Sequence, residues 1–288
     1  VIQKRIIKQM TSKPCEHRYL LRSSIKEFFI CKNSSFASKT NKCTINSDNL
    51  YNSSFFSSLI TNTVTDHQPL SQYLSLRKTA VVLLKTISSS FSLCDKTFHL
   101  SVLLLDRIYS KINSFTEINF ISVFCLILAA KFTEDDASKA SLLQKSYSRS
   151  LSSNYNSDEI FLLKLLDYNL STPTGYDILS YMLSIGIVTN DEFASSKQTV
   201  DSIEHICLSY LNSLIQYNFV LPLSPLQIAL GVIQIARKKI GLPSYTNELI
   251  EKFELSDKEN IFKEAYSSFA KVLNKKRRQE ESKCLVVL

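Results

Sequence analysis

Glycine and proline are scarce in this sequence, with 4 glycines and 6 prolines among 288 residues. A fold of many short strands would need more of these turn residues, whereas the abundant leucine, isoleucine, lysine and serine suit helices. Four glycines also cannot supply a glycine-rich loop that cradles phosphate, and neither a G-x-G-x-x-G nor a Walker lysine motif occurs. The composition therefore predicts a mainly α-helical protein and does not suggest a nucleotide site.

Spacings typical of metal ligands are also missing. The seven cysteines are an odd number with no C-x-x-C pair, which argues against a zinc cluster and against a secreted disulfide framework. The four histidines, at positions 17, 67, 99 and 205, show no spacing that would place two imidazoles on one helical face. We interpret the acidic run Glu134–Asp136 as a solvated turn rather than a cation site. We therefore expect no metal, no cofactor and no catalytic site, and a reducing compartment.

The positive charge is concentrated at one end of the chain. The formal net charge is +8, of which residues 1–65 carry +7 and residues 66–288 carry +1. Residues 1–65 are rich in Ser, Asn and Lys without a sustained period, which predicts a disordered basic tail. Because the remainder is nearly neutral, we expect no direct DNA binding. No apolar run approaches the roughly 18 to 20 residues of a membrane span, so we expect no membrane partner either.

Apolar residues recur at helical spacing from about residue 71 onward. Five helices are predicted in a first unit, over residues 71–89, 95–110, 116–132, 138–147 and 157–168. Five more are predicted in a second unit, over residues 173–185, 195–217, 223–240, 244–253 and 256–273. Asp95 or Thr97 is the expected N-cap of the second helix, and Thr172 before Pro173 that of the sixth.

The third helix of each unit is apolar nearly all round, so we expect it in the middle of a bundle. Two units with the same helix count and the same buried third helix imply a duplication. The predicted fold is therefore all-α with two tandem five-helix repeats. Their expected bounds are residues 66–170 and 171–274, followed by a basic tail over residues 275–288.

Several segments resemble the cyclin box, in the order in which that family has them. Leu104–Ser110 reads LLDRIYS and Leu128–Glu134 reads LAAKFTE. Leu93–Val102 (LCDKTFHLSV), Leu162–Leu170 (LLKLLDYNL) and Pro173–Leu179 (PTGYDIL) extend the match. The resemblance is good over residues 71–185 and thins beyond, where Pro222–Leu230 is similar to the third helix of a second repeat.

The resemblance implies a cyclin, a non-catalytic subunit that binds and activates a cyclin-dependent Ser/Thr protein kinase. Binding would reposition the regulatory helix and the activation loop of the kinase. Lys131 and Glu159 would grip backbone groups beside that helix, with Phe132 in the same contact surface. Arg77 and Asp106 would form an internal ion pair that fastens the first helix to the second. A cyclin would act in the nucleus, the cytoplasm or both.

The sequence departs from the family where many cyclins carry a groove for Arg-x-Leu peptides. Leu76, Ala80, Leu83 and Asn119 stand at groove positions, and Thr79, Ala80 and Leu83 replace larger apolar or aromatic residues there. We therefore expect a weakened groove. Ubiquitin-ligase recognition stays open, because residues 18–21 fit a minimal R-x-x-L and residues 258–260 spell KEN.

Two other functions fit the same fold. A two-repeat transcription factor that binds promoter DNA would favour a basic face within the repeats and an N-terminal zinc ribbon, and the charge and cysteine patterns argue against both. A helical scaffold without kinase binding is the second alternative. Co-purification of a kinase whose activity depends on this chain would separate these readings.

Overall fold

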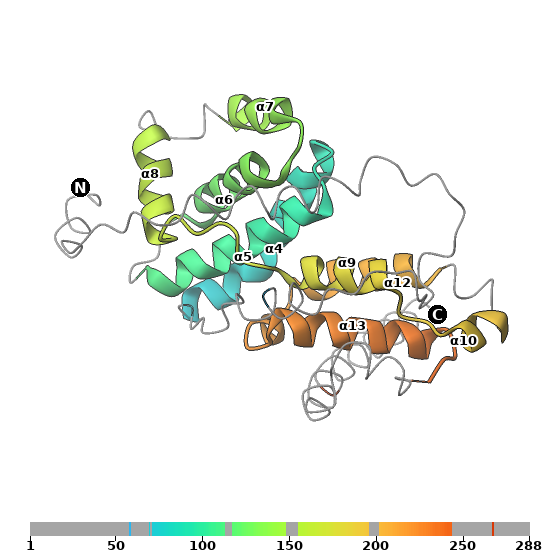
Figure 1. Cartoon of the computed structure of the whole chain (residues 1–288). Coiled ribbons are helices and arrows are strands. Elements are labelled where there is room, and N and C mark those ends of the chain that lie inside the picture. The colour runs from blue at the N-terminus through green and yellow to red at the C-terminus, as the bar shows by residue number, and fades with distance from the viewer. Residues whose placement is uncertain are drawn as a thin grey trace, which may run out of the picture. The chain divides into compact units, whose positions relative to one another are not determined.

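In the computed structural model, the described residues are 58, 69, 71–112, 117–147, 155–195, 202–243 and 267, and all of them belong to one compact unit of the chain (Figure 1). Every element longer than a turn in this part is a helix, which confirms the all-α prediction. Apart from residue 267, the predicted helices over residues 244–253 and 256–273 lie outside the described residues. So do both tails, apart from residue 58, and the two degradation-like signals.

The first bundle follows the predicted order of five helices. Its helices are α4 (Ser71–Ser90), α5 (Asp95–Lys111), α6 (Ile118–Thr133), α7 (Ala137–Tyr147) and α8 (Tyr155–Leu165). Helix α6 packs against α4, α5 and α7, and Figure 1 shows it between α5 and α7.

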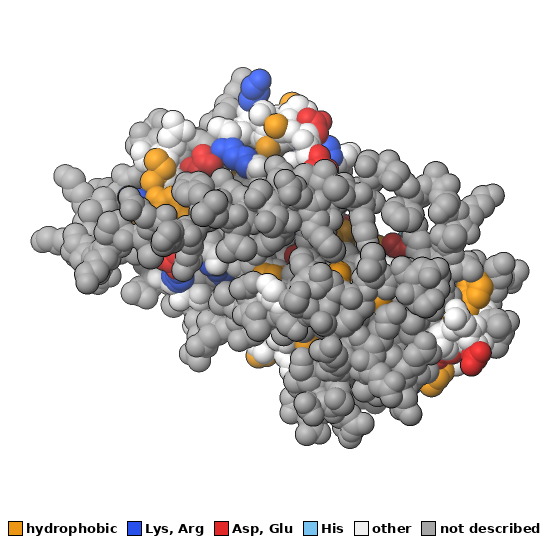
Figure 2. Space-filling model, in the orientation of Figure 1, with side chains coloured by type: hydrophobic (Ala, Val, Ile, Leu, Met, Phe, Trp, Pro, Cys, Tyr) orange, Lys and Arg blue, Asp and Glu red, His pale blue; other side chains and the backbone are white. Residues whose placement is uncertain are grey.

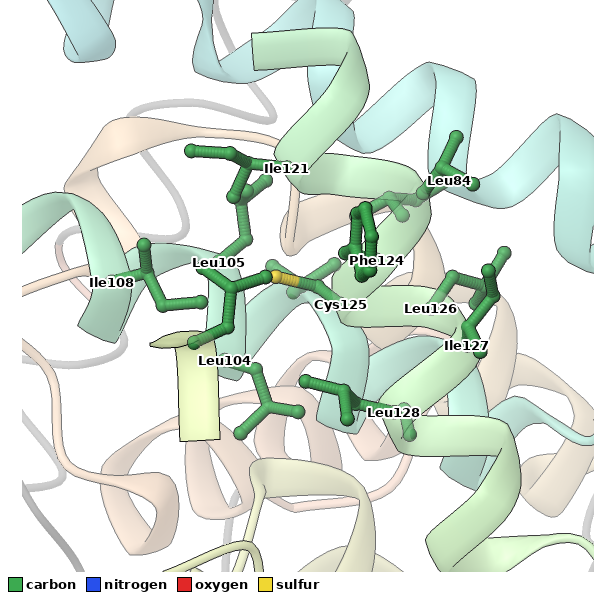
Figure 3. Close-up of a cluster of buried hydrophobic side chains, with 14 of the residues drawn as sticks. Leu84, Leu104, Leu105, Ile108, Ile121, Phe124, Cys125, Leu126, Ile127 and Leu128 are labelled. Carbon is green, nitrogen blue, oxygen red and sulfur yellow. The ribbon is translucent and has the colours of Figure 1, made fainter. Parts of the chain in front are cut away.

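The prediction that the third helix lies in the middle of this bundle is confirmed. All ten residues from Ile121 to Ala130 are buried. Figure 3 shows Phe124 and Cys125 of α6 among side chains of α4 and α5, including Leu84 and Leu105. A helix that is apolar on every face is shielded from water only when other helices surround it. Burial of this apolar surface supplies much of the driving force for folding.

The second group of helices differs more from the prediction. It contains α9 (Gly175–Ile185), α10 (Asn190–Ser195), α12 (Ile203–Leu214), the 3₁₀ helix η2 (Asn218–Val220) and α13 (Pro225–Lys239). Helix α13 packs against α9 and α12. The helix predicted over residues 195–217 extends too far at its C-terminal end, because α12 (Ile203–Leu214) ends at Leu214. Residues 196–201 of this prediction lie outside the described residues.

The predicted helix caps were also wrong, and in both cases a neighbouring residue does the capping. Thr174, and not Thr172, caps α9, where its hydroxyl and the carboxylate of Asp177 form a reciprocal capping box. Cys94, and not Asp95 or Thr97, caps α5, and its sulfur accepts a hydrogen bond from the backbone N–H of Thr97. Asp95 and Thr97 lie in the first turn of α5, and Thr172 lies two residues before the true cap of α9. The presence of a polar residue near a helix start therefore did not show which residue has the backbone geometry of a cap.

The two bundles meet through polar groups on α5, α9 and α12. The Nε2 atom of His99 lies 2.8 Å from Oδ1 of Asn212, and Nδ2 of Asn212 lies 3.3 Å from Oδ2 of Asp95. Because the amide nitrogen of Asn212 donates to Asp95, its oxygen accepts from His99, which therefore carries its proton on Nε2. The ring of His99 also stacks on Tyr176 of α9 at 5.5 Å between centroids. A buried histidine thus joins the two bundles.

Candidate functional site

Lys131 and Glu159, which the resemblance singled out, meet on the surface of the first bundle. Nζ of Lys131 lies 2.7 Å from Oε1 of Glu159. Their side chains are 37% and 19% exposed, so the pair is open to a partner without being fully in water.

Helix geometry explains why these two residues meet at an edge of the core. Lys131 directly follows the buried run of α6, which places it where the helix emerges from the bundle. Glu159 lies one turn before the buried Leu162 on α8, at the border of the buried face of that helix. The cation also lies in the last turn of α6, where the helix dipole favours positive charge.

An apolar residue directly follows each member of the pair in the chain. Phe132 is half-buried and packs against the core of the first bundle. Ile160 on α8 and Leu142 on α7 are 48% and 58% exposed, which is high for large apolar residues. On the face drawn in Figure 2, a basic and an acidic side chain lie next to each other between hydrophobic side chains over α8 and over α7. This arrangement offers a partner one donor, one acceptor and an apolar border.

Arg77 and Asp106, the residues expected to pair, form a two-bond ion pair inside the first bundle. Nε of Arg77 lies 2.7 Å from Oδ1 of Asp106, and Nη2 lies 2.9 Å from Oδ2. The hydroxyl of Tyr73 donates to the same carboxylate. Burial, reinforced by the negative charge of Asp106, raises the pKa of Tyr73 well above its ordinary value. The guanidinium also donates to the carbonyl of Ile215, directly after α12, at 3.0 Å. One buried arginine of α4 thus binds both α5 of its own bundle and the second bundle.

Arg107, whose role the sequence did not indicate, stabilises the end of α8. It is 5% exposed, and its Nη1 donates to the carbonyl of Asn169 at 2.7 Å and to the hydroxyl of Thr172 at 3.1 Å. Its Nη2 donates to the carbonyl of Leu166 at 3.2 Å. In the sequence, only its position next to Asp106 in the LLDRIYS segment could have indicated a structural role for Arg107. Hydrophobic periodicity does not predict that an arginine is buried.

The interpretation of the acidic run as a solvated turn was wrong for Glu134. The side chain of Glu134 is 4% exposed. It accepts hydrogen bonds from the backbone N–H of Cys94 at 2.7 Å, from the hydroxyl of Thr97, and from Lys139 at 3.0 Å. Burial alone would raise the pKa of Glu134, but these hydrogen bonds lower it overall. Glu134 thus fastens the beginning of α5 to the end of α6.

The four residues assigned to the weakened peptide groove lie in different environments. Leu76 is 39% exposed and Ala80 is fully buried in the core. Leu83 is half-buried and Asn119 is exposed. Ala80 therefore offers no surface to a peptide, and the weakening of the groove stays a prediction.

The described residues contain neither a candidate metal site nor a helix that could span a membrane. No group of three or more His, Cys, Asp or Glu side chains in this part of the chain could hold a metal ion. No helix among the same residues is long and apolar enough to cross a membrane.

Comparison with known proteins connects this chain with one family. Residues 47–171 match the family model of the cyclin N-terminal domain. Cyclin-J of Homo sapiens is 31% identical over 131 residues, which are 42% of this chain and 35% of that protein. Cyclin-J-like protein of Mus musculus is 26% identical over 200 residues, 64% of this chain and 51% of that protein. The chain therefore spans about a third to a half of the length of these two relatives.

A solved structure resembles the fold as well. The X-ray structure of a viral cyclin from Herpesvirus saimiri superposes with a TM-score of 0.50 at 16% sequence identity. The match covers 70% of this chain and 87% of the viral protein. At this identity the likeness shows the fold alone.

Proposed function

We propose that this chain, whose residues 47–171 match the cyclin N-terminal domain, is a cyclin that binds and activates a cyclin-dependent Ser/Thr protein kinase. In this proposal the chain supplies no catalytic group. It binds the active arrangement of the kinase more tightly than the inactive one, and so presses the regulatory helix inward and reorders the activation loop. Nucleotide and metal belong to the kinase.

One observation carries the proposal: Lys131 and Glu159, which are 28 positions apart in the chain and lie on different helices, meet at 2.7 Å on a partly exposed surface. An exposed ion pair of this kind stabilises a fold by only about 0 to 1 kcal/mol, so stability does not explain it well. A partner that excludes water strengthens both groups as hydrogen-bonding sites. The ammonium group can donate to backbone carbonyls and the carboxylate can accept from backbone N–H groups, as expected for a grip on a helix end.

In this proposal the ion pair alone does not supply enough binding free energy to activate a kinase, so the apolar residues Phe132, Leu142 and Ile160 must contribute. Moving a kinase from 1% to 99% active requires roughly 10⁴-fold tighter binding of the active form, or about 5.5 kcal/mol. Two hot-spot residues contribute about 2 kcal/mol each when truncated, and such values are not additive. Burial of Ile160, Leu142 and the exposed part of Phe132 supplies the remaining differential, at about 25 cal/mol per Å² of apolar surface.

The test uses single substitutions at the pair. Recombinant human cyclin-dependent kinase catalytic subunits are assayed one at a time for binding to the chain and for activity in its presence. We expect Lys131→Ala and Glu159→Ala each to weaken binding about thirtyfold, which corresponds to about 2 kcal/mol, and to lower activation.

Matched controls come from the second bundle. Lys238→Ala removes an exposed lysine that also lies in the last turn of its helix, α13. Glu204→Ala removes a half-buried glutamate from the first turn of α12. Both should leave binding unchanged. Unchanged binding in both pair variants would refute the assignment, and a parent chain that binds none of the kinases would refute the function.

We also propose that the protein works in the nucleus, the cytoplasm or both. The three described cysteines, Cys94, Cys125 and Cys207, are free thiols, which suits a reducing compartment. Fractionation of cells that express the tagged chain tests this, and recovery in the secreted fraction would contradict it.

A further inference from the structure

The two bundles have separate apolar cores. The first core consists mainly of side chains from α4, α5, α6 and α8, and the second mainly of side chains from α9, α12 and α13. Among the described residues, the half-buried Ile215 is the one that packs against both cores. Burial of apolar surface is what holds each bundle together. The joint, where α4 and α5 meet α9, α12 and η2, therefore contains little of the surface that stabilises the bundles themselves.

Most of the contacts that cross the joint involve polar groups. Beside the hydrogen bonds of Asn212 described above, Nζ of Lys96 on α5 lies 3.3 Å from Oδ1 of Asp177 on α9. Nδ2 of Asn218 in η2 donates to the carbonyl of Leu74 on α4 at 2.8 Å. Water can replace each of these contacts when the bundles separate, so each of them contributes only modestly to holding the bundles together. Polar interfaces of this kind between parts of one chain commonly permit relative motion.

The chain crosses from one bundle to the other at Pro173. Arg107 of α5 donates to the hydroxyl of Thr172 at 3.1 Å, so the first bundle holds the chain up to that residue. Thr174 belongs to the second bundle, where it caps α9 together with Asp177. Pro173 therefore lies between two anchored ends. A change of backbone angles in this short segment moves the second bundle as a body, as at other hinges formed by a few residues at the end of an element.

Separation of the bundles leaves their buried ion pairs intact. Arg77 loses its bond to the carbonyl of Ile215 but keeps both bonds to Asp106, which belongs to its own bundle. In the second bundle, Arg237 stays bound to Glu192. The large penalty for leaving a buried charge without its partner therefore does not arise for either pair.

We propose that the second bundle rotates about Pro173 while both bundles stay folded, and that the polar contacts of the joint are a latch that holds the closed form. The inference does not rest on the proposed kinase partner. Lys131 and Glu159 both belong to the first bundle, so their ion pair is unchanged in the open form. A partner that touches both bundles binds the closed form alone, and its apparent affinity falls with the fraction of chains that are open.

Three native side chains report separately on the opening of the joint and of the two cores. His99 lies in the joint, Cys125 in the core of the first bundle and Cys207 in that of the second, and all three are buried. The full chain is treated with diethyl pyrocarbonate, which modifies accessible imidazoles, or with N-ethylmaleimide, which modifies accessible thiols. Mass spectrometry of peptides gives the rate at each site, relative to the urea-unfolded chain. We expect His99 to be accessible at least about tenfold more often than either thiol, because local opening costs less free energy than unfolding of a core.

Two lysine variants test the latch. Lys96→Ala removes the ion pair with Asp177 and leaves in place the side chains that hydrogen-bond or stack on the ring of His99. It should raise the accessibility of His99 about threefold, the size expected for a partly exposed ion pair. Lys111→Ala is the matched control. It removes a lysine of the same helix whose ion pair with Asp167 lies within the first bundle, and it should leave the accessibility of His99 unchanged.

The results that would overturn the inference are distinct from those that bear on the proposed function. If His99 is no more accessible than the two thiols, the joint opens only when the chain unfolds, and the hinge is refuted. No rise in Lys96→Ala, or an equal rise in Lys111→Ala, refutes the latch. None of these measurements uses a kinase, so failure of the proposed function leaves the inference standing.

Discussion

Mild acid should weaken this fold through His99, the histidine that joins the two bundles. Its ring is 2% exposed and lies between Asn212, Tyr176 and Phe98. Burial lowers the pKa of His99 from 6.5 to about 4. The hydrogen bond to Asn212 and the negative charges of Asp95 and Asp177 act in the opposite direction, and Lys85 adds to the lowering. Burial outweighs the groups that would stabilise the charged ring.

The pKa of His99 is lower in the folded chain than in the unfolded chain, and this difference makes the free energy of unfolding depend on pH. Between pH 6.5 and pH 4 the unfolded chain binds a proton at His99 and the folded chain does not, so the free energy of unfolding falls as the pH falls through this window. Above pH 6.5 the contribution is complete. A difference of about 2.5 between the two pKa values corresponds to about 3 kcal/mol in full, of which about 2 kcal/mol is lost by pH 5.

Urea unfolding at pH 8 and pH 5 measures this loss. We expect the parent chain to lose about 2 kcal/mol more between the two pH values than His99→Gln. Glutamine cannot take up a proton in this range, and its amide can still donate to Asn212. His205→Gln, which changes an exposed histidine of α12, is the control and should behave like the parent. Equal losses in the parent and in His99→Gln would refute the reasoning.

Two further substitutions test the packing that positions the site. Asp106→Asn removes the charge opposite the buried Arg77 and should lower the free energy of unfolding by about 3 to 5 kcal/mol; a loss below about 1 kcal/mol in urea unfolding would show that the pair is effectively solvated. Gly175→Ala places a Cβ atom 2.9 Å from Cγ2 of Ile228 and should destabilise the chain by about 1 to 3 kcal/mol. Ile228→Leu, which removes the branch at Cβ, should recover part of that loss in the same chain. No recovery would mean that the clash is not the cause.

The pairing of Lys131 with Glu159 could be expected from the sequence only through the family resemblance. Taken by themselves, a helical lysine and a helical glutamate are ordinary surface residues, and nothing in their spacing shows that α6 and α8 bring them to 2.7 Å. The same holds for Arg77 and Asp106, whose burial is visible only when α4 and α5 are packed together.

Sequence reasoning failed where a polar residue turned out to be buried. Glu134 was interpreted as solvated because acidic runs usually are, but its carboxylate receives hydrogen bonds from the beginning of α5. Arg107 received no role, although three oxygens of the segment after α8 accept its hydrogen bonds. In both cases the partner lies tens of residues away, and local patterns carry no information about such a distance.

By itself the sequence determined the helical class, the approximate bounds of the first five helices and the central position of α6, because these depend on periodicity and on the scarcity of turn residues, which are local properties. Only the tertiary structure decided which polar side chains are buried and which residue caps each helix. Those outcomes depend on contacts between segments far apart in the chain, where the desolvation of a charge is offset only if a partner from another helix is in place.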